Sequence, residues 1–210
     1  MLRVGAESIV SIVLWRGRQL IKKHRIPKRY RRSEIDERIR KSRTIHEAKV
    51  MTTLSENGVP VPVIIFLDMT NSSIYMQRIM GMELRDYLAK DGWDGLDVAE
   101  DVGAVAGLTH KLSISHGDLT LSNIMVGESG GLWLIDFGLS LYNATLEEMG
   151  VDVHLLERSV VSTFPGLAAE FMSRFTEGYG SVVGEQMVAK IFGKVAEIRR
   201  RGRYVERRSR

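Results

Sequence analysis

The 210-residue sequence predicts an α+β fold in two lobes, a small strand-rich N-terminal lobe with one main helix and a reduced helical C-terminal lobe. Short β-branched runs mark the first 80 residues, whereas apolar residues recur at helical spacing over much of the remainder. In addition, Asp118, Asn123 and Asp136 flank a predicted strand hairpin at the spacing that phosphoryl-transfer catalytic loops use.

The N-terminal lobe is expected to cover residues 1–80. Ser33 is a reasonable N-cap for a long helical pattern that follows a basic stretch around Pro27. The predicted strands take up residues 9–15, 19–23, 61–67 and 74–79, and the predicted helix takes up residues 33–56.

The C-terminal lobe is expected to cover residues 81–198, before a basic tail at 199–210. A first helix carries an apolar stripe at helical spacing and ends just before the catalytic loop. Residues 124–126 and 132–135 are predicted strands, joined by a turn at 128–131. The stripe consists of Val98, Val102, Val105, Leu108 and Leu112, and the later helices are expected at 146–163, 166–176 and 181–201.

The loop that begins His116-Gly117-Asp118 carries the predicted chemistry. In such loops the first Asp, here Asp118, orients or accepts the proton of the attacking hydroxyl. Asn123 and Asp136 then hold Mg²⁺ on the phosphates of ATP. An Asp-Phe-Gly triplet alone is usually just a strand end and a turn, but loop, spacing and hairpin together predict a protein-kinase-like fold.

A kinase also needs a lysine on its third strand and a glutamate on the next helix. Lys22 and Lys23 both lie on the expected strand, and strand alternation does not choose between them. Glu47 lies in the following helix, where we expect it to pair with that lysine. The remaining predicted nucleotide contacts are Met76 beside the adenine, with the backbone of Gln77 and Ile79 at its edge.

Two expected kinase features are missing from the sequence. The only candidate for a phosphate-covering glycine loop is at residues 5–8, which lack the G-x-G-x-x-G pattern. No Ala-Pro-Glu signature follows Gly138, and Gly117 replaces the arginine that usually reads activation-segment phosphorylation. The sequence therefore predicts a kinase without a full activation segment, on which a partner docks in place of generic peptides.

Positive charge is concentrated in two segments. Residues 22–43 carry eleven Lys/Arg against three acids, a net +8, and residues 194–210 carry eight against two, a net +6. The whole chain has a net charge of +4, so the rest sums to −10. Such segregation favours a polyanionic partner. With no cysteine and no long apolar run, we expect a cytoplasmic protein without a membrane partner.

Several sequence blocks together identify a family resemblance. The most specific are Lys-His-Arg-Ile-Pro-Lys at 23–28, Arg-Thr-Ile-His-Glu-Ala at 43–48, and Arg-Gly-Arg-Tyr at 201–204. From about residue 5 to the C-terminus, the chain closely resembles the bud-site-selection kinase family, the small atypical kinase/ATPase subunit of the KEOPS complex. A short glycine loop and a missing activation segment are also typical of that family.

The resemblance implies Lys23 as the nucleotide lysine. It also implies a non-specific serine/threonine kinase with ATPase activity, which autophosphorylates alone and hydrolyses ATP with its partner. That partner is the threonylcarbamoyl-transferase subunit, beside the other KEOPS subunits, and the process is threonylcarbamoyladenosine formation in tRNAs that read A-starting codons. The expected tRNA contacts lie in the basic tail: Arg199, Arg200, Arg201, Arg203, Tyr204, Arg207 and Arg208.

Two alternatives remain open at this point. A small-molecule phosphotransferase of the aminoglycoside or choline kinase type also uses His-Gly-Asp, but it usually has a larger helical lobe. An inactive scaffold that binds tRNA and a partner would be expected to lack Asp118, Asn123 or Asp136, and all three are present.

Overall fold

The computed structural model describes the backbone of residues 3–5 and 7–208, and the side chains of residues 4–5 and 7–201. The chain divides into two compact units, Met1–Met80 and Gly81–Arg210. No helix in the described part of the chain is both long and apolar enough to cross a bilayer.

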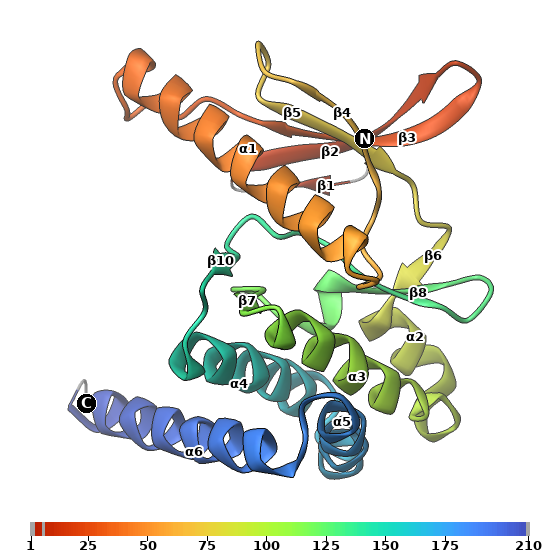
Figure 1. Cartoon of the computed structure of the whole chain (residues 1–210), viewed down its shortest axis with the longest axis vertical. Helices are drawn as coiled ribbons and strands as arrows, with labels where there is room; N and C mark the ends of the chain where they lie inside the picture. The colour runs from red at the N-terminus through yellow and green to blue at the C-terminus, as the bar shows by residue number, and fades with distance from the viewer. Residues whose placement is uncertain (1–2, 6, 209–210) are drawn as a thin grey trace. The chain divides into compact units, whose positions relative to one another are not determined.

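The first unit is an antiparallel sheet of five strands in the order β1-β2-β3-β5-β4, with one helix. Figure 1 shows this helix, α1, running along the sheet. The register places Lys23 of β3 opposite Val10 of β2 and Ile74 of β5, near the middle of the sheet. The elements are β1 (Arg3–Val4), β2 (Ser8–Trp15), β3 (Arg18–Arg25), α1 (Ser33–Glu56), β4 (Ile64–Asp68) and β5 (Ser73–Gln77).

Helix α1 has the bounds that the sequence predicts, but its N-cap differs. The backbone N–H of Asp36 donates to the carbonyl of Arg32 at 2.9 Å, which makes Arg32 the cap residue and Ser33 the first helical residue. The expectation that Ser33 is the N-cap is therefore wrong. The helix buries Ala48, Met51 and Leu54, and its buried face also carries Glu47.

Strand β4 begins later than the sequence predicts. Residues 61–63 precede the strand, which starts at Ile64. Pro60 and Pro62 explain the shift, since proline has no N–H to donate to a sheet ladder. Val61 is still buried, so the apolar run reflects core packing before the strand begins.

The second unit contains the predicted hairpin and is otherwise mostly helical. Strands β8 and β9 pair antiparallel, with Ile124 opposite Leu134. Two short strands that flank the 116–123 loop and the Asp-Phe-Gly triplet, β7 and β10, also pair. The elements are β6 (Gly81–Glu83), α2 (Leu84–Asp91), η1 (Gly92–Gly95), α3 (Val98–Lys111), β7 (Ile114–Ser115), η2 (Leu121–Asn123), β8 (Ile124–Gly127), β9 (Leu132–Leu134), β10 (Leu141–Tyr142), α4 (Leu146–Thr163), α5 (Ala168–Val183) and α6 (Glu185–Arg208).

The last two helices differ from their predicted ranges. Helix α5 continues through Gly178 and Gly180, and the chain turns at Gly184, whose φ of 82° suits glycine. Helix α6 then extends through Arg208, so the basic tail from residue 199 continues that helix as far as the structure describes. Helices α4 and α6 run alongside each other in this unit (Figure 1).

Glycines allow α3 and α5 to pack backbone against backbone. A Cβ placed on Gly178 of α5 would lie 1.8 Å from the carbonyl oxygen of Glu100 in α3. A Cβ on Gly103 of α3 would lie 2.0 Å from the carbonyl oxygen of Phe175 in α5. Because both obstacles are backbone atoms, no side-chain rotation relieves them. The crossing therefore requires glycine on both helices.

We expect Gly178→Ala to lower the free energy of unfolding by about 1–3 kcal/mol or more, because the added methyl forces α3 and α5 apart. The matched control is Gly193→Ala in α6, where an added Cβ meets nothing within 4 Å. That control should stabilise the chain by roughly 0.5–1 kcal/mol through helix propensity. Urea unfolding of both variants measures the difference, and equal stabilities would contradict the close crossing.

Candidate functional site

The 116–123 loop begins with two residues whose conformations are fixed by their surroundings. Gly117 has a φ of 80°, and a Cβ there would lie 2.1 Å from the carbonyl oxygen of Leu139. His116 is buried, and its ring packs against Phe137 with centroids 4.6 Å apart. The loss of the usual arginine at position 117 thus has a local cause, since no side chain fits there.

The ring nitrogens of His116 contact Asp118 within the loop and Ile135 just after β9. Nε2 is 3.1 Å from the carbonyl oxygen of Ile135, and Nδ1 is 3.3 Å from the backbone nitrogen of Asp118. Nε2 therefore donates and Nδ1 accepts, as in a neutral imidazole. Burial lowers the pKa of His116, against the opposing charge of Asp152. The ring is a neutral structural link between the loop and the Asp-Phe-Gly triplet.

Asn123 holds the side chain of Asp118. Its Nδ2 donates to the Asp118 carboxylate at 2.9 Å and to the Asp118 carbonyl oxygen at 2.8 Å. Asn123 is buried, whereas Asp118 is half-buried. This pair of hydrogen bonds fixes the orientation of the carboxylate, and it leaves the amide oxygen Oδ1 as the Asn123 atom suited to bind a cation.

Asp136 is brought to Asn123 by the hairpin. The backbone N–H of Ile135 donates to the carbonyl oxygen of Asn123 at 2.9 Å, one residue before Asp136. Asp136 is exposed and has a φ of 66°, a left-handed conformation that Asp tolerates better than most residues. The predicted strand hairpin is confirmed, and it places the two expected cation ligands at neighbouring strand ends.

A buried carboxylate also holds the 116–123 loop, and the sequence analysis did not assign it a role. Asp152 of α4 accepts the backbone N–H of His116 at 2.6 Å and that of Gly117 at 2.8 Å. Its side chain is completely buried, where an ionised carboxylate needs such donors. A sequence signal existed, because Asp152 stands between two valines in an apolar part of its helix.

The same carboxylate connects to two further buried side chains. His110 of α3 lies 3.3 Å from Asp152, and its other ring nitrogen lies 2.8 Å from the hydroxyl of Tyr179 in α5. Burial raises the pKa of Tyr179, and the charge of Asp152 adds to this effect. The hydroxyl therefore keeps its proton. Three helices converge on the loop through this network.

In the first unit, one buried carboxylate binds two cations. Lys23 Nζ lies 2.7 Å from Oε1 of Glu47, and Nη2 of Arg25 lies 2.6 Å from Oε2. All three side chains are at least nine-tenths buried. The expected Lys23–Glu47 ion pair is present, and Arg25 is an additional partner that the sequence reasoning missed. Lys22 lies instead over the ring of Tyr75, 5.4 Å from its centroid.

The predicted adenine contacts lie at and after the end of β5. Met76 is buried within the sheet, opposite Ile21. Gln77 is exposed, and its backbone N–H donates to the carbonyl oxygen of Val63 at 2.8 Å. Ile79 is half-buried and follows the strand without regular structure. The Gln77 N–H is thus already used by Val63, the residue just before β4.

The tail arginines that the structure describes lie on one helix, and two of them bind α4. Arg199 pairs with Glu157, with Nε 2.8 Å from Oε2, and Arg201 pairs with Glu147. Arg200 is exposed. The side chains of the other expected tRNA contacts lie outside the described residues, namely Arg203, Tyr204, Arg207 and Arg208.

Comparison with known proteins matches nearly the whole length of the chain. The sequence model of the lipopolysaccharide kinase (Kdo/WaaP) family matches residues 3–179. The KEOPS complex subunit Bud32 of Pyrococcus abyssi is 41% identical over 190 residues, which are 90% of this chain and 86% of that protein. A probable serine/threonine-protein kinase BUD32 homolog of Archaeoglobus fulgidus is 36% identical, covering 97% of this chain and 96% of that protein.

A third relative is a larger protein. The probable bifunctional tRNA threonylcarbamoyladenosine biosynthesis protein of Methanothermobacter thermautotrophicus is 37% identical over 206 residues. These residues are 98% of this chain but only 37% of that protein. The counterpart of this chain is therefore one part of a longer polypeptide in that organism.

Proposed function

Because the chain belongs to the Bud32 family of KEOPS complex subunits, we propose that it is an ATP-dependent atypical kinase and ATPase that supports threonylcarbamoyladenosine formation in tRNA. The transferred group is the γ-phosphoryl of ATP, and the acceptor is a serine hydroxyl of the chain itself or, with the partner subunit, water. A cytoplasmic location suits this role.

The observation that carries the proposal is the arrangement of Asp118, Asn123 and Asp136. Asn123 orients the Asp118 carboxylate at 2.9 Å, and the β8–β9 hairpin ties Asn123 to the residue before Asp136. A carboxylate held in this way can align a hydroxyl or a water molecule and accept its proton. An inactive scaffold has no need for these constraints.

The donor chemistry of Asn123 and Asp136 fits Mg²⁺. Their amide and carboxylate oxygens are hard ligands, and Mg²⁺ usually takes only one or two protein ligands beside water and phosphate oxygens. Among the described residues, no group of three or more His, Asp or Glu forms an all-protein metal cage. Bound Mg²⁺ supplies neutralisation of phosphate charge. Lys23, oriented by Glu47, supplies a further positive charge for the phosphates.

The partner is proposed from the larger relative. In that protein the counterpart of this chain forms 37% of a polypeptide named for threonylcarbamoyladenosine biosynthesis. We propose that the separate partner here is the threonylcarbamoyl-transferase subunit, acting with the other KEOPS subunits on tRNA. The tail helix is the proposed tRNA contact. Arg200 is exposed already. Arg199 and Arg201 can leave their pairs with α4 to bind tRNA, because each surface pair is worth only about 0–1 kcal/mol.

ATP turnover by the purified chain tests the proposal. Phosphate release and autophosphorylation are measured with Mg²⁺ or with EDTA, and then with the transferase partner and tRNA. We expect Mg²⁺-dependent autophosphorylation by the chain alone and faster phosphate release with the partner. An absence of turnover under all conditions would favour the scaffold, whereas efficient phosphorylation of aminoglycosides or choline would favour a small-molecule kinase.

We expect Lys23→Ala to lower ATP turnover by about 10²–10³-fold, because it removes a preorganised positive charge from the phosphates. Lys22→Ala is the matched control. It loses only a partly exposed contact with Tyr75, worth roughly 0.5–1 kcal/mol to stability, and should change turnover little. Nucleotide affinity and turnover are measured for both variants. Equal, small effects would show that Lys23 does not touch the nucleotide.

A further inference from the structure

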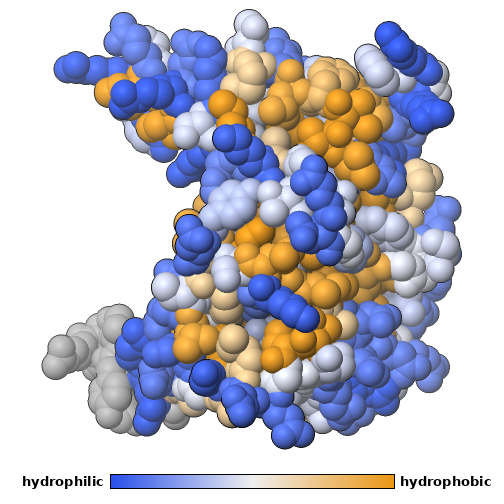
Figure 2. Space-filling view, viewed as in Figure 1, coloured by the Kyte–Doolittle hydropathy of each residue, from blue (hydrophilic) through white to orange (hydrophobic). Residues whose placement is uncertain are grey.

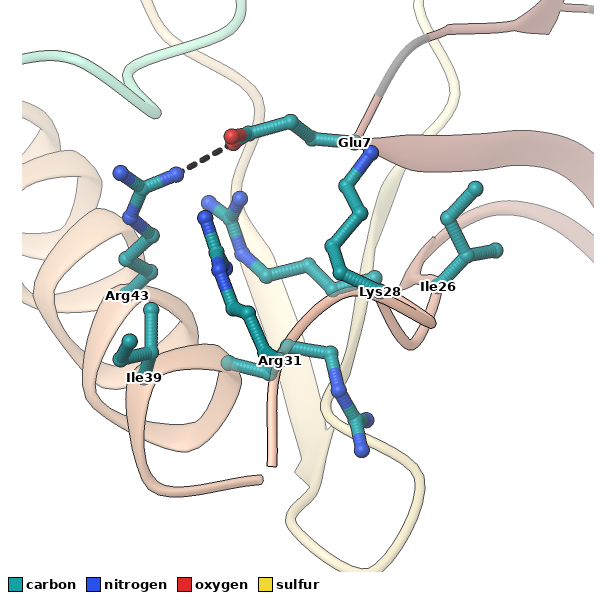
Figure 3. Close-up of a pocket in the computed structure, with 8 residues that line it drawn as sticks. Glu7, Ile26, Lys28, Arg31, Ile39 and Arg43 are labelled. Carbon is teal, nitrogen blue, oxygen red and sulfur yellow. Dashed lines mark hydrogen bonds and ion pairs between the residues drawn. The ribbon is translucent and has the colours of Figure 1, made fainter. Parts of the chain in front are cut away.

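A cluster of cationic side chains surrounds a hollow in the first unit. The loop between β3 and α1 contributes Lys28 and Arg31, and α1 contributes Arg40 and Arg43. Arg25 lines the hollow from the end of β3, and Glu7 is the carboxylate beside it. Figure 3 shows the side chain of Glu7 directed toward Arg43. We call this group of six residues the arginine pocket.

The carboxylates near the arginine pocket do not balance its positive charge. Its five cations have three acidic neighbours, which are Glu7, Asp36 and Glu47. Asp36 binds Arg40 at 2.7 Å and Arg31 at 3.6 Å. Glu47 is also shared, since it binds Lys23 as well as Arg25. The pocket therefore keeps an excess of positive charge that an anion can neutralise.

One buried donor in the arginine pocket has no hydrogen-bond partner in the described part of the chain. Nε of Arg25 makes no hydrogen bond among the described residues, although the side chain is only 5% exposed. A buried N–H without an acceptor is costly, so such groups usually indicate a missing ligand or water. An anion with several acceptor oxygens supplies what this guanidinium lacks.

Glu7 keeps the pocket partly neutral when no anion is bound. Burial opposes ionisation of Glu7, but the hydrogen bond from Arg43 and the charges of Arg43, Arg25 and Lys28 together lower its pKa. The carboxylate is half exposed, and its pair with Arg43 joins the residue just before β2 to α1. A surface pair of this kind is weak, so a phosphate group can displace it.

An exposed aromatic residue lies in the same segment. Tyr30 is 78% exposed, and the guanidinium of Arg31 lies 5.2 Å from its ring centroid. Arg29 and Arg32, on either side of this pair, are exposed too. Figure 2 shows mostly hydrophilic side chains over the N-terminal turns of α1. Cations around an exposed ring are typical of surfaces that bind a nucleic acid strand, because the ring stacks on a base.

We propose that the arginine pocket binds a backbone phosphate of RNA and that Tyr30 stacks on an adjacent unpaired base. This inference rests on the proposed tRNA-linked function, and it adds a second RNA contact distinct from the tail. Free phosphate shares the anion chemistry, but it has no use for the exposed ring. The ring is the reason for assigning the site to a nucleic acid strand.

Fluorescence anisotropy with the full chain tests this proposal, with no nucleotide present. The probes are an unmodified tRNA transcript and a short oligouridine, each titrated at several KCl concentrations. The double variant K28Q/R31Q should weaken RNA binding about tenfold at low salt and reduce the slope of log K against log salt by about 0.7 for one lost phosphate contact. Tyr30→Ala should weaken binding roughly fivefold to tenfold with an unchanged slope.

Matched controls distinguish a specific RNA site from non-specific electrostatic attraction, which we call diffuse attraction. Arg38→Gln removes an exposed charge of α1 outside the pocket, and Trp93→Ala removes a 62% exposed aromatic residue of the other unit. Both should leave RNA affinity within about twofold of the wild type. Thermal melting confirms that every variant folds.

Two results would overturn the proposal. The first is a loss of binding free energy per removed charge that is the same in the double variant and in Arg38→Gln, which would mean only diffuse attraction. The second concerns inorganic phosphate. If phosphate raises the melting temperature of the wild type but not of the double variant, while both bind RNA equally well, the pocket is a site for free anions. Because no nucleotide is present, a chain that fails to turn over ATP can still give a positive result here.

Discussion

Asp136→Ala is expected to reduce Mg²⁺-dependent ATP turnover by 10³-fold or more, on the order of 4 kcal/mol of transition-state stabilisation. Asp136 is one of two residues proposed to hold the metal, and its side chain is exposed, so its loss leaves the core intact. The measurement is phosphate release over a range of Mg²⁺ concentrations. Turnover near the wild-type rate would remove Asp136 from the metal site.

Two further variants make the Asp136 result specific. Alanine at a φ of 66° also costs about 1–2 kcal/mol of backbone strain, whereas asparagine tolerates that conformation. Asp136→Asn keeps one oxygen ligand, so it should fold normally and regain partial turnover at high Mg²⁺. Asp94→Ala removes another exposed carboxylate of the same unit and should leave turnover unchanged.

Asp152→Ala is expected to lower the free energy of unfolding by about 3–5 kcal/mol, because it strips a buried hydrogen-bond network of its acceptor. The backbone N–H groups of His116 and Gly117 lose their partner, and so does His110. Since those N–H groups hold the 116–123 loop, turnover should fall even at temperatures where the variant is folded. Urea unfolding and single-turnover kinetics measure the two effects.

The control for Asp152 is Asp101→Ala, which removes an exposed carboxylate of α3 and should change stability by less than about 0.5 kcal/mol. Asp152→Asn is more informative about mechanism. Its amide offers one acceptor where the carboxylate offers two, so one loop N–H faces another donor. Stability and turnover like the wild type in both Asp152 variants would contradict an anchoring role.

Local patterns predicted the parts of this chain that depend on local spacing. Asp118, Asn123 and the hairpin follow from residues within a short segment, and the range of α1 follows from its periodicity. Asp152 was missed because its partners at His116 and Gly117 lie 36 and 35 residues away. Its role depends on packing of helices that no local pattern encodes.

The predicted boundaries of the last two helices were wrong for a related reason. Glycines usually mark breaks, so Gly178 and Gly180 favoured an early end to the preceding helix. In the structure Gly178 instead permits close contact with Glu100 of α3, and the break comes at Gly184. Tertiary packing overrode the local preference. The glycine nearest the true turn differs in its positive φ, which the sequence does not reveal.

The shared carboxylate of Glu47 has a consequence for how such an enzyme is switched off. Many kinases rest with their helical glutamate swung away from the lysine, and activation returns it. Here an outward swing of α1 would abandon Lys23 and Arg25 together, two nearly buried cations on one strand. Because two buried cations would lose their carboxylate at once, α1 has no outward position of low free energy. The Lys23–Glu47 pair is thus expected to stay formed, so that regulation of activity comes from partners and substrates.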